Sequence, residues 1–335
     1  MIKKIAIYGL GNFGYAMLKH FDSKSNEFAT VHAYDRNKKL INFLKKHRRH
    51  LYLHKSIKIS PKIIFEDNVN GLLSDCDVLI LAVNSNSTRE VICKIKKRVR
   101  NNLIIVNTAK ALDYKTGKRL SEIFNQELSN KKFQYALLAG GTIARDLFNH
   151  EPLGADIVCE NKKILPTLTN LFHAANLTVY PTTDLKGVEY ASSFKSIIAI
   201  MAGIINGMKF SYGSETHMIS RCAYEIQQII LSLGGKPETF DMKSQSWSND
   251  LWMSCTGNSR NREFGKMLGS GISVDKATAI MKRQHKTIEG INTLKGLKRN
   301  KMIRDYPLMN FLYQFIILKS TALNELKRLI FSQQY

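Results

Sequence analysis

A glycine-rich turn near the amino terminus constrains the fold of this chain more than any other feature. The turn, Gly9-Leu10-Gly11-Asn12-Phe13-Gly14, follows the apolar run 4–8 and precedes residues 15–21, which have helical spacing. A GxGxxG spacing alone is weak evidence, but between a strand and a helix it indicates a dinucleotide site. The first glycine permits a tight turn, the second admits a pyrophosphate, and the third lets the helix pack on the strand. The sequence therefore predicts a helix whose amino terminus faces phosphates.

A second predicted strand, residues 28–34, ends at two residues that bear on cofactor choice. Asp35 lies about 20 residues beyond the glycines, where a carboxylate binds the ribose 2′-hydroxyl of NAD. Arg36 is suited to the 2′-phosphate of NADP. The pair leaves the choice between NAD and NADP open. The cofactor-binding residues expected here are Gly9, Gly11, Asn12, Phe13, Gly14, Asp35 and Arg36.

The remaining pattern divides the chain into two halves. Further apolar runs occupy residues 78–83, 103–106, 135–139, 155–159 and 177–180, with a helix predicted over 163–175. Continuous apolar runs are typical of parallel strands that are covered on both faces. Beyond the break at 181–184, helical spacing fills residues 188–208, 214–233, 261–268, 274–283 and 309–331. We expect an α/β fold, with a Rossmann-type, mostly parallel sheet that binds a dinucleotide over 1–183 and an all-helical substrate-binding and catalytic domain over 184–335.

Composition restricts the class of protein. A chain of 335 residues with 44% hydrophobic residues is expected to form about two packed domains. No run reaches the ~18 apolar residues of a membrane span, and no signal segment is evident, so a cytoplasmic protein without membrane insertion is predicted. The five cysteines are scattered without metal-ligand spacing, which favours buried free thiols and no metal site.

A net charge of +23 raises the question of an anionic partner. Basic clusters lie at 45–50, 94–100 and 295–301, but no nucleic-acid-binding module or interleaved aromatic residues accompany them. Solvated helix faces are therefore favoured over a specific nucleic-acid partner. Positive potential would also steer anionic substrates and cofactors toward the protein.

Lys195 is set in an unusual environment, because it is the single charge in a predicted helix of small and apolar residues over 190–203. Burial lowers the pKa of a lysine and makes it a competent acid or base. The alternative is that the side chain reaches the surface or pairs structurally.

Several motifs together resemble those of bacterial-type NAD(P)-dependent glycerol-3-phosphate dehydrogenases, over nearly the whole chain. They comprise the glycine turn, residues 107–112 with 116–120, residues 139–147, the helix around Lys195 with Gly203, residues 250–256 with 259–265, and Glu289-Gly290. Several residues depart from the family pattern, among them Ser196 and residues 246–249 before Asp250. These departures lie near the two residues on which catalysis would depend.

The resemblance implies a role for each matching residue. Lys195 is the acid/base, Asp250 orients it, and Lys110 stabilises negative charge at the reacting carbonyl. Arg260 and Asn261 bind the substrate phosphate, for which a guanidinium is well suited. Further substrate contacts are implied for Gly140, Thr142 and Ser259, and cofactor contacts for Lys110, Ala144, Arg260 and Glu289.

The leading hypothesis is a glycerol-3-phosphate dehydrogenase that reduces dihydroxyacetone phosphate with NADH or NADPH, supplying phospholipid synthesis. A divergent relative that acts on another small phosphorylated ketone or hydroxy acid is the alternative enzyme. A basic nucleic-acid-binding protein on a Rossmann shell is the alternative from another class. The sequence itself leaves the oligomeric state open, and the resemblance implies a homodimer.

Overall fold

The computed structural model describes residues 2–24, 30–297 and 301–331, which group into two compact units. The first unit contains residues up to Ala109 and then Leu120–Leu185, and the second contains Lys110–Arg119 and Lys186–Tyr335. Residues 28–29 of one predicted strand and residues 298–300 of one basic cluster lie outside the described part.

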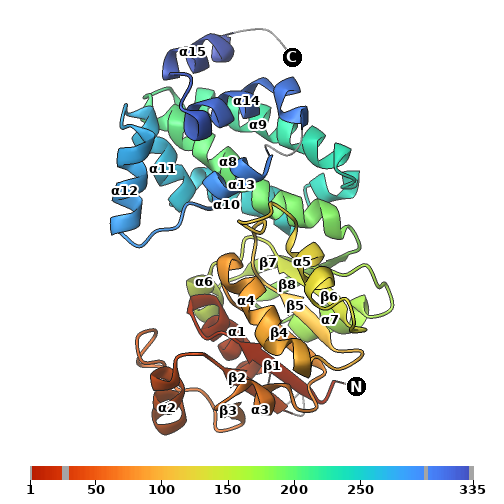
Figure 1. Ribbon diagram of the computed structural model, residues 1–335. Helices are drawn as coiled ribbons and strands as arrows, with labels where there is room; N and C mark the ends of the chain where they lie inside the picture. Colours follow the sequence, from red (N-terminus) through yellow and green to blue (C-terminus); the bar gives the residue numbers. More distant parts are fainter. Residues whose placement is uncertain (1, 25–29, 298–300, 332–335) are drawn as a thin grey trace. The chain divides into compact units, whose positions relative to one another are not determined.

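The first unit is built on an eight-stranded sheet (Figure 1). Every neighbouring pair of strands is parallel except β6 and β7, which are antiparallel. In sheet order the strands are β3 (Ile63–Phe65), β2 (Thr30–Tyr34), β1 (Lys4–Tyr8), β4 (Val78–Leu81), β5 (Ile104–Asn107), β6 (Gln134–Ala139), β7 (Leu153–Val158) and β8 (Leu177–Thr182). The mostly parallel sheet expected from the continuous apolar runs is confirmed, and β1 and β4 are buried along their whole length.

Helices cover both faces of this sheet. The order of the strands reverses at β1, and right-handed crossovers therefore place the helices that follow β1 and β4 on opposite faces. Accordingly α1 packs on α6, and α4 packs on α5. The helices of this unit are α1 (Asn12–Ser23), α2 (Lys38–His47), α3 (Val69–Leu73), α4 (Ser85–Ile95), the short η1 (Lys96–Arg98), α5 (Leu120–Glu127), α6 (Ala144–Phe148) and α7 (Leu165–Phe172).

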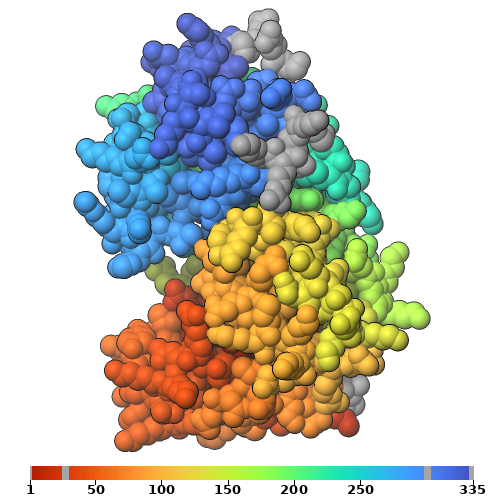
Figure 2. Space-filling model, in the orientation of Figure 1, coloured from red at the N-terminus to blue at the C-terminus, as the bar shows by residue number. Residues whose placement is uncertain are grey.

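The second unit is helical and surrounds one long apolar helix, α8 (Leu185–Gly207). By length and composition α8 could cross a membrane, but 94% of its most apolar stretch is buried inside the protein, as expected for a core helix. The other helices are α9 (Tyr212–Ser232), η2 (Pro237–Phe240), the π-helical η3 (Gln245–Asn249), α10 (Asp250–Thr256), α11 (Arg260–Gly269), α12 (Val274–Arg283), α13 (Glu289–Leu297), η4 (Lys301–Asp305), α14 (Pro307–Leu312), η5 (Tyr313–Leu318) and α15 (Leu323–Phe331). Figure 2 shows the blue carboxyl-terminal elements forming much of this unit's surface on the face in view.

The predicted single helix over 309–331 is wrong, because the chain breaks there. The π-helical η5 ends at Leu318, the next residue Lys319 has a left-handed φ of 55°, and α15 begins only at Leu323. Apolar residues on both sides of the break pack on the same core, so the apolar spacing continues across it. The strand β3 was not predicted, since it is only three residues long and follows a basic loop.

Two further expectations differ from the structure in part. Four of the five cysteines are buried free thiols, but Cys93 on α4 is exposed, with its Sγ 3.6 Å from Glu127 Oε2 of α5. Residues 110–119, expected in the first domain, group with the second unit. They do so because Arg119 pairs with Glu189 of α8 and Lys110 pairs with Asp250 of α10.

Candidate active site

The glycine turn between β1 and α1 has the geometry that its sequence predicts. Gly9 has a φ of +95°, and a Cβ on it would lie 2.6 Å from the Ala82 carbonyl oxygen. A Cβ on Gly14 would lie 1.8 Å from the Gly9 carbonyl oxygen, so α1 packs directly against the turn. A Cβ on Gly11 would meet no atom within 4 Å, and no side chain caps α1 at this residue. The turn is thus closed by Gly9 and Gly14 and open at Gly11, where a phosphate can approach the free N–H groups of α1.

Asp35, at the end of β2, supports this turn directly. Its Oδ2 accepts a hydrogen bond from the Leu10 N–H at 2.8 Å, and its Oδ1 accepts one from the Asn37 N–H at 2.8 Å. Arg36 is exposed beside it. The carboxylate therefore holds the shape of the turn, and the guanidinium faces solvent.

His50 is a supporting residue that the sequence did not reveal. Its Nε2 donates to the Leu10 carbonyl oxygen at 2.9 Å, while its Nδ1 accepts from the N–H groups of Tyr52 and Leu53. Burial lowers the pKa of this imidazole. Its Nδ1, which accepts two hydrogen bonds, carries no proton in this arrangement. Its position at the end of a basic cluster concealed this role, because a histidine there resembles one more solvated cation.

A second glycine turn follows β6. Gly140 has a φ of +139°, and its carbonyl oxygen accepts a hydrogen bond from the Thr142 N–H at 2.8 Å. Thr142 is buried, and Ala144 begins α6 just beyond it. The first unit therefore holds Gly140, Thr142 and Ala144 in one tight connection after a strand.

Two lysines and one aspartate form the centre of the second unit's candidate site. Asp250 is completely buried at the start of α10, and its Oδ2 forms ion pairs with Lys195 of α8 and, at 3.2 Å, with Lys110. Lys195 is itself 7% exposed. The structure therefore brings together the three residues expected to be catalytic, from segments far apart in the sequence.

Burial controls the ionisation of Lys195. The pKa of Lys195 is lowered to about 8, chiefly because burial removes its ammonium group from water; Asp250 opposes this shift and the nearby charge of Lys110 adds to it. Asp250 thus stabilises the charged form of a group that burial would otherwise neutralise. The result is a lysine that exchanges its proton near physiological pH.

A π-helical turn delivers Asp250 to this position. The turn, η3, runs straight into α10, and the Ser244 hydroxyl accepts a hydrogen bond from the Trp247 N–H at its start. Single π-turns of this kind are frequent at functional sites. Among the described residues, Asp250 Oδ1 has no hydrogen-bond partner, so half of this buried carboxylate is available to another group.

A buried ion pair fixes the segment that carries Lys110. Arg119 lies at the end of that segment, and its Nη1 is 3.1 Å from Glu189 Oε2 on α8. Both side chains are nearly buried. The sequence did not assign these two residues a role, although a glutamate in the first turns of an apolar helix is a signal, because a buried carboxylate needs a cation.

The start of α11 holds the remaining candidate residues. The Ser259 hydroxyl caps this helix, since it accepts from the Arg262 N–H at 3.1 Å and donates to the Ser254 carbonyl oxygen. Asn261 Oδ1 accepts from the Gly290 N–H at 3.0 Å, which leaves the Asn261 amide hydrogens for another acceptor. Arg260 is half-exposed, with its Nη2 3.6 Å from Glu289 Oε1.

Comparisons with known protein families show the family to which this chain belongs. Residues 4–165 match the model of the NAD-dependent glycerol-3-phosphate dehydrogenase N-terminus, and residues 184–326 match that of its C-terminus. The chain belongs to this family. It is 31% identical to a glycerol-3-phosphate dehydrogenase [NAD(P)+] of Clostridium botulinum, over 95% of this chain and 94% of the relative. It is 32% identical to the Fusobacterium nucleatum protein of the same name, over 88% and 85%.

Solved dehydrogenase structures share the fold. The glycerol-3-phosphate dehydrogenase of Coxiella burnetii superimposes with a TM-score of 0.84 at 22% identity, covering 99% of both chains. That of Plasmodium falciparum gives 0.88 at 18% identity, covering 100% of this chain and 96% of the other. The Rossmann-type sheet followed by a helical region, expected from the sequence, is therefore confirmed as the fold of this dehydrogenase family member.

Proposed function

We propose that this chain is an NAD(P)-dependent glycerol-3-phosphate dehydrogenase, which interconverts dihydroxyacetone phosphate and sn-glycerol 3-phosphate. One observation carries the proposal beyond family membership. The buried Lys195 has a pKa near 8 and pairs with Asp250, whose same oxygen also binds Lys110. A ketone reductase requires such a proton donor together with a positive field at the carbonyl oxygen.

The first unit supplies the proposed cofactor site. The open space at Gly11 and the uncapped amino terminus of α1 fit a pyrophosphate, with Asn12 and Phe13 in the first turn of that helix. Asp35 and Arg36 are the proposed contacts with the adenine-side ribose. Ala144 of this unit is a further proposed cofactor contact. The second unit adds the proposed contacts Lys110, Arg260 and Glu289. When bound, the nicotinamide ring supplies the hydride that reduces the carbonyl carbon.

Lys195 and Lys110 have different tasks in this proposal. Lys195 Nζ gives its proton to the carbonyl oxygen as negative charge develops there, and in the reverse direction it removes the hydroxyl proton. Lys110 keeps its proton and stabilises that oxygen electrostatically. Asp250 holds both ammonium groups on one side of the site, so that neither must reorient during the reaction.

The other end of the substrate is assigned to α11. The guanidinium of Arg260 and the free amide hydrogens of Asn261 provide donors for a phosphate, next to the capping hydroxyl of Ser259. Gly140 and Thr142 are the proposed contacts from the first unit. Phosphate binding contributes to catalysis because it fixes the carbonyl relative to Lys195.

The direct test is turnover by the purified protein. We expect dihydroxyacetone phosphate to oxidise NADH or NADPH, measured as loss of absorbance of the reduced nicotinamide, and dihydroxyacetone to react far more slowly. A Lys195→Ala preparation is the control for contaminating dehydrogenase. Absence of turnover with the phosphorylated ketone under either cofactor would refute the proposal.

A second candidate is a relative with another small phosphorylated ketone or hydroxy acid as substrate. Two departures from the family pattern favour it, since Ser196 directly follows Lys195 and residues 246–249 form the π-turn before Asp250. A panel of small ketones assayed beside dihydroxyacetone phosphate separates the two. A higher kcat/KM for another member of the panel would select the second candidate.

The proposal extends to the cellular compartment, the oligomeric state and the partners of this protein. We assign the enzyme to the cytoplasm, where sn-glycerol 3-phosphate would supply phospholipid synthesis, and we expect a homodimer, which light scattering can measure. No specific nucleic-acid partner is proposed. Oligonucleotide binding that is tight, sequence-dependent and persistent in salt would contradict that assignment.

A further inference from the structure

One buried carboxylate joins three helices of the second unit. Glu215, in the first turn of α9, is only 3% exposed. Its Oε1 accepts hydrogen bonds from Nε and Nη2 of Arg262 at 3.1 and 2.7 Å, and its Oε2 accepts one from Asn206 Nδ2 at 3.0 Å. Asn206 belongs to the last turn of α8, and Arg262 to the first turn of α11. Both oxygens of Glu215 are therefore committed to holding neighbouring helices.

Glycines bring α8 and α11 into direct backbone contact at the same place. A Cβ on Gly203 would lie 2.1 Å from the Arg262 carbonyl oxygen, and one on Gly265 would lie 2.0 Å from the Ile200 carbonyl oxygen. The contact repeats one turn later, where a Cβ on Gly207 or Gly269 would lie 2.2 or 2.1 Å from a carbonyl oxygen of the other helix. These glycines set how closely the two helices approach.

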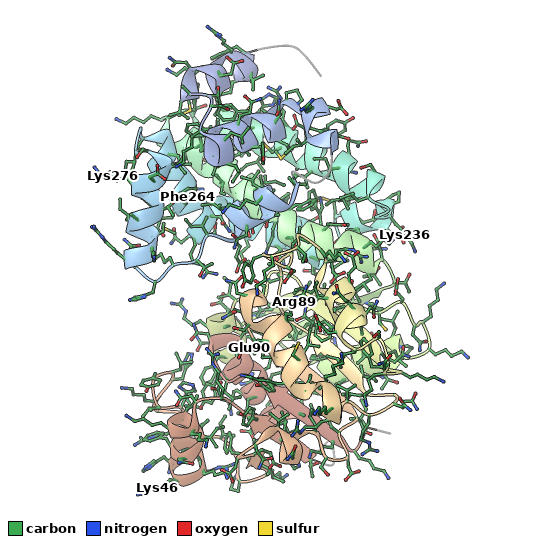
Figure 3. The ribbon with its side chains drawn as sticks, in the orientation of Figure 1. Lys46, Arg89, Glu90, Lys236, Phe264 and Lys276 are labelled. Carbon is green, nitrogen blue, oxygen red and sulfur yellow. The ribbon has the colours of Figure 1, made fainter. Side chains whose placement is uncertain are left out.

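Close approach alone does not fix how α11 is rotated about its own axis. The helix is held on its inner side by Phe264, which is completely buried and is labelled on α11 in Figure 3. On the first turn, the bond between Arg262 and Glu215 supplies a second, directional restraint, because a guanidinium fork accepts few orientations. Arg260 and Asn261 immediately precede Arg262, so any rotation of this turn moves them as well.

We propose that Glu215 is a positioning residue for substrate binding, which sets the first turn of α11 so that Arg260 and Asn261 meet the substrate phosphate. The inference rests on the proposed function for the identity of that phosphate. It adds a residue of α9, a helix that contributes none of the proposed contacts with substrate or cofactor.

Glu215→Gln tests this assignment, and the same helix provides a matched control. The substitution replaces one accepting oxygen by an NH₂ group, which then faces a donor of Asn206 or Arg262. Glu225, also buried on α9, accepts instead from the N–H groups of Leu308 and Met309 at the start of α14. Glu225→Gln therefore makes the same chemical change away from α11.

A compensating variant separates positioning from general damage. In Asn206→Asp combined with Glu215→Gln, the new Gln amide can donate to the new carboxylate while its oxygen still accepts from Arg262. The network keeps its net charge, with the negative charge moved by one residue. If Glu215→Gln does not fold, Arg262→Lys weakens the same contact while keeping the cation, and it replaces Glu215→Gln in both measurements.

Steady-state kinetics give the first readout. We expect Glu215→Gln to lower kcat/KM for dihydroxyacetone phosphate by about 10- to 100-fold, mainly through KM, because a misplaced binding group is costly. The slow reduction of unphosphorylated dihydroxyacetone is expected to stay within about twofold of wild type. Glu225→Gln is expected to change neither kcat/KM for dihydroxyacetone phosphate nor the slow reduction of dihydroxyacetone. The compensating double variant is expected to recover most of the loss in kcat/KM.

Amide hydrogen exchange gives a second readout that does not depend on the substrate. Glu215→Gln is expected to accelerate exchange in residues 260–265, whereas Glu225→Gln accelerates it at the start of α14. Unchanged exchange in residues 260–265, or equal acceleration in both variants, would overturn the assignment of Glu215. If wild type does not reduce dihydroxyacetone phosphate, the proposed function fails separately, and exchange still decides whether Glu215 holds this turn.

Discussion

The candidate residues of the two units are of different kinds. In the first unit they are mostly backbone groups at glycine turns, and a side chain would block the space at Gly11 rather than fill a role there. In the second unit they are ionised side chains, and the centre of the set is the buried Asp250 between two lysines. A backbone site is specified by the absence of side chains at a few positions. A side-chain site depends on the helices that bring its charges together.

The largest expected effect separates chemistry from cofactor binding. Lys195→Ala should lower kcat by at least about 100-fold, since a general acid contributes 10²–10⁴-fold. Cofactor affinity, measured by fluorescence titration, should remain nearly unchanged, because the glycine turn belongs to the other unit. A variant that retained more than about a hundredth of wild-type kcat would remove the acid/base role from Lys195.

Arg260→Lys tests the geometry of the phosphate group. A lysine keeps the charge but cannot donate two parallel hydrogen bonds, so kcat/KM for dihydroxyacetone phosphate should fall by about 100-fold, part of it in kcat. Reduction of unphosphorylated dihydroxyacetone is the internal control and should hardly change. Equal losses on both substrates would instead assign Arg260 to the cofactor or to the fold.

Two alanine substitutions in the glycine turn should have opposite consequences. Gly11→Ala places a methyl group in open space, so the free energy of unfolding should stay within about 0.5 kcal/mol of wild type while the cofactor Kd rises about tenfold. Gly14→Ala places it against the Gly9 carbonyl oxygen and should destabilise the fold by about 2 kcal/mol or more. Chemical denaturation and cofactor titration of both variants measure the contrast. Similar changes in both variants would mean that Gly11 is needed for the fold rather than for the ligand.

The lowered pKa of Lys195 predicts a pH dependence whose direction depends on the direction of the reaction. Reduction needs the protonated ammonium, so its kcat/KM should fall about tenfold per unit above pH 8, whereas oxidation needs the neutral amine and should rise up to that pH. The free energy of unfolding should also depend on the ionisation of Lys195. Between pH 8 and 10.5 this lysine is mostly protonated in the unfolded state and mostly neutral in the folded state. The contribution of Lys195 to the free energy of unfolding therefore increases as the pH rises through this window. Parallel pH profiles for the two reaction directions would contradict this assignment.

The smallest expected effect concerns cofactor choice. Arg36→Ala removes a cation from the end of β2. It should lower the preference for NADPH over NADH by about several-fold, because one contact with the 2′-phosphate is lost. The ratio of kcat/KM values for the two cofactors measures it. An unchanged ratio would make Arg36 a solvated turn residue.

The sequence predicted local features well and long-range pairings less well. The glycine turn and the isolated charge of Lys195 carry their meaning within a dozen residues, and both lie where the pattern placed them. The arginine partners of Glu189 and Glu215 are 70 and 47 residues distant in the chain, so no local spacing reveals them. The break at Lys319 was missed because it interrupts the backbone without interrupting the apolar pattern, and the antiparallel pairing of β7 depends on a connection that has no sequence signature.

The discontinuity of the second unit affects the order in which this protein can fold during synthesis. Residues 110–119 leave the ribosome early, but Asp250 follows Arg119 by about 130 residues. Lys110 precedes Asp250 by 140 residues. At about 5–20 residues per second, Lys110 therefore waits roughly 7–28 s for its carboxylate partner. During that interval the segment is a polar loop between β5 and α5 of the first unit. Nascent helices of the second unit must then assemble around a loop that was made before any of them.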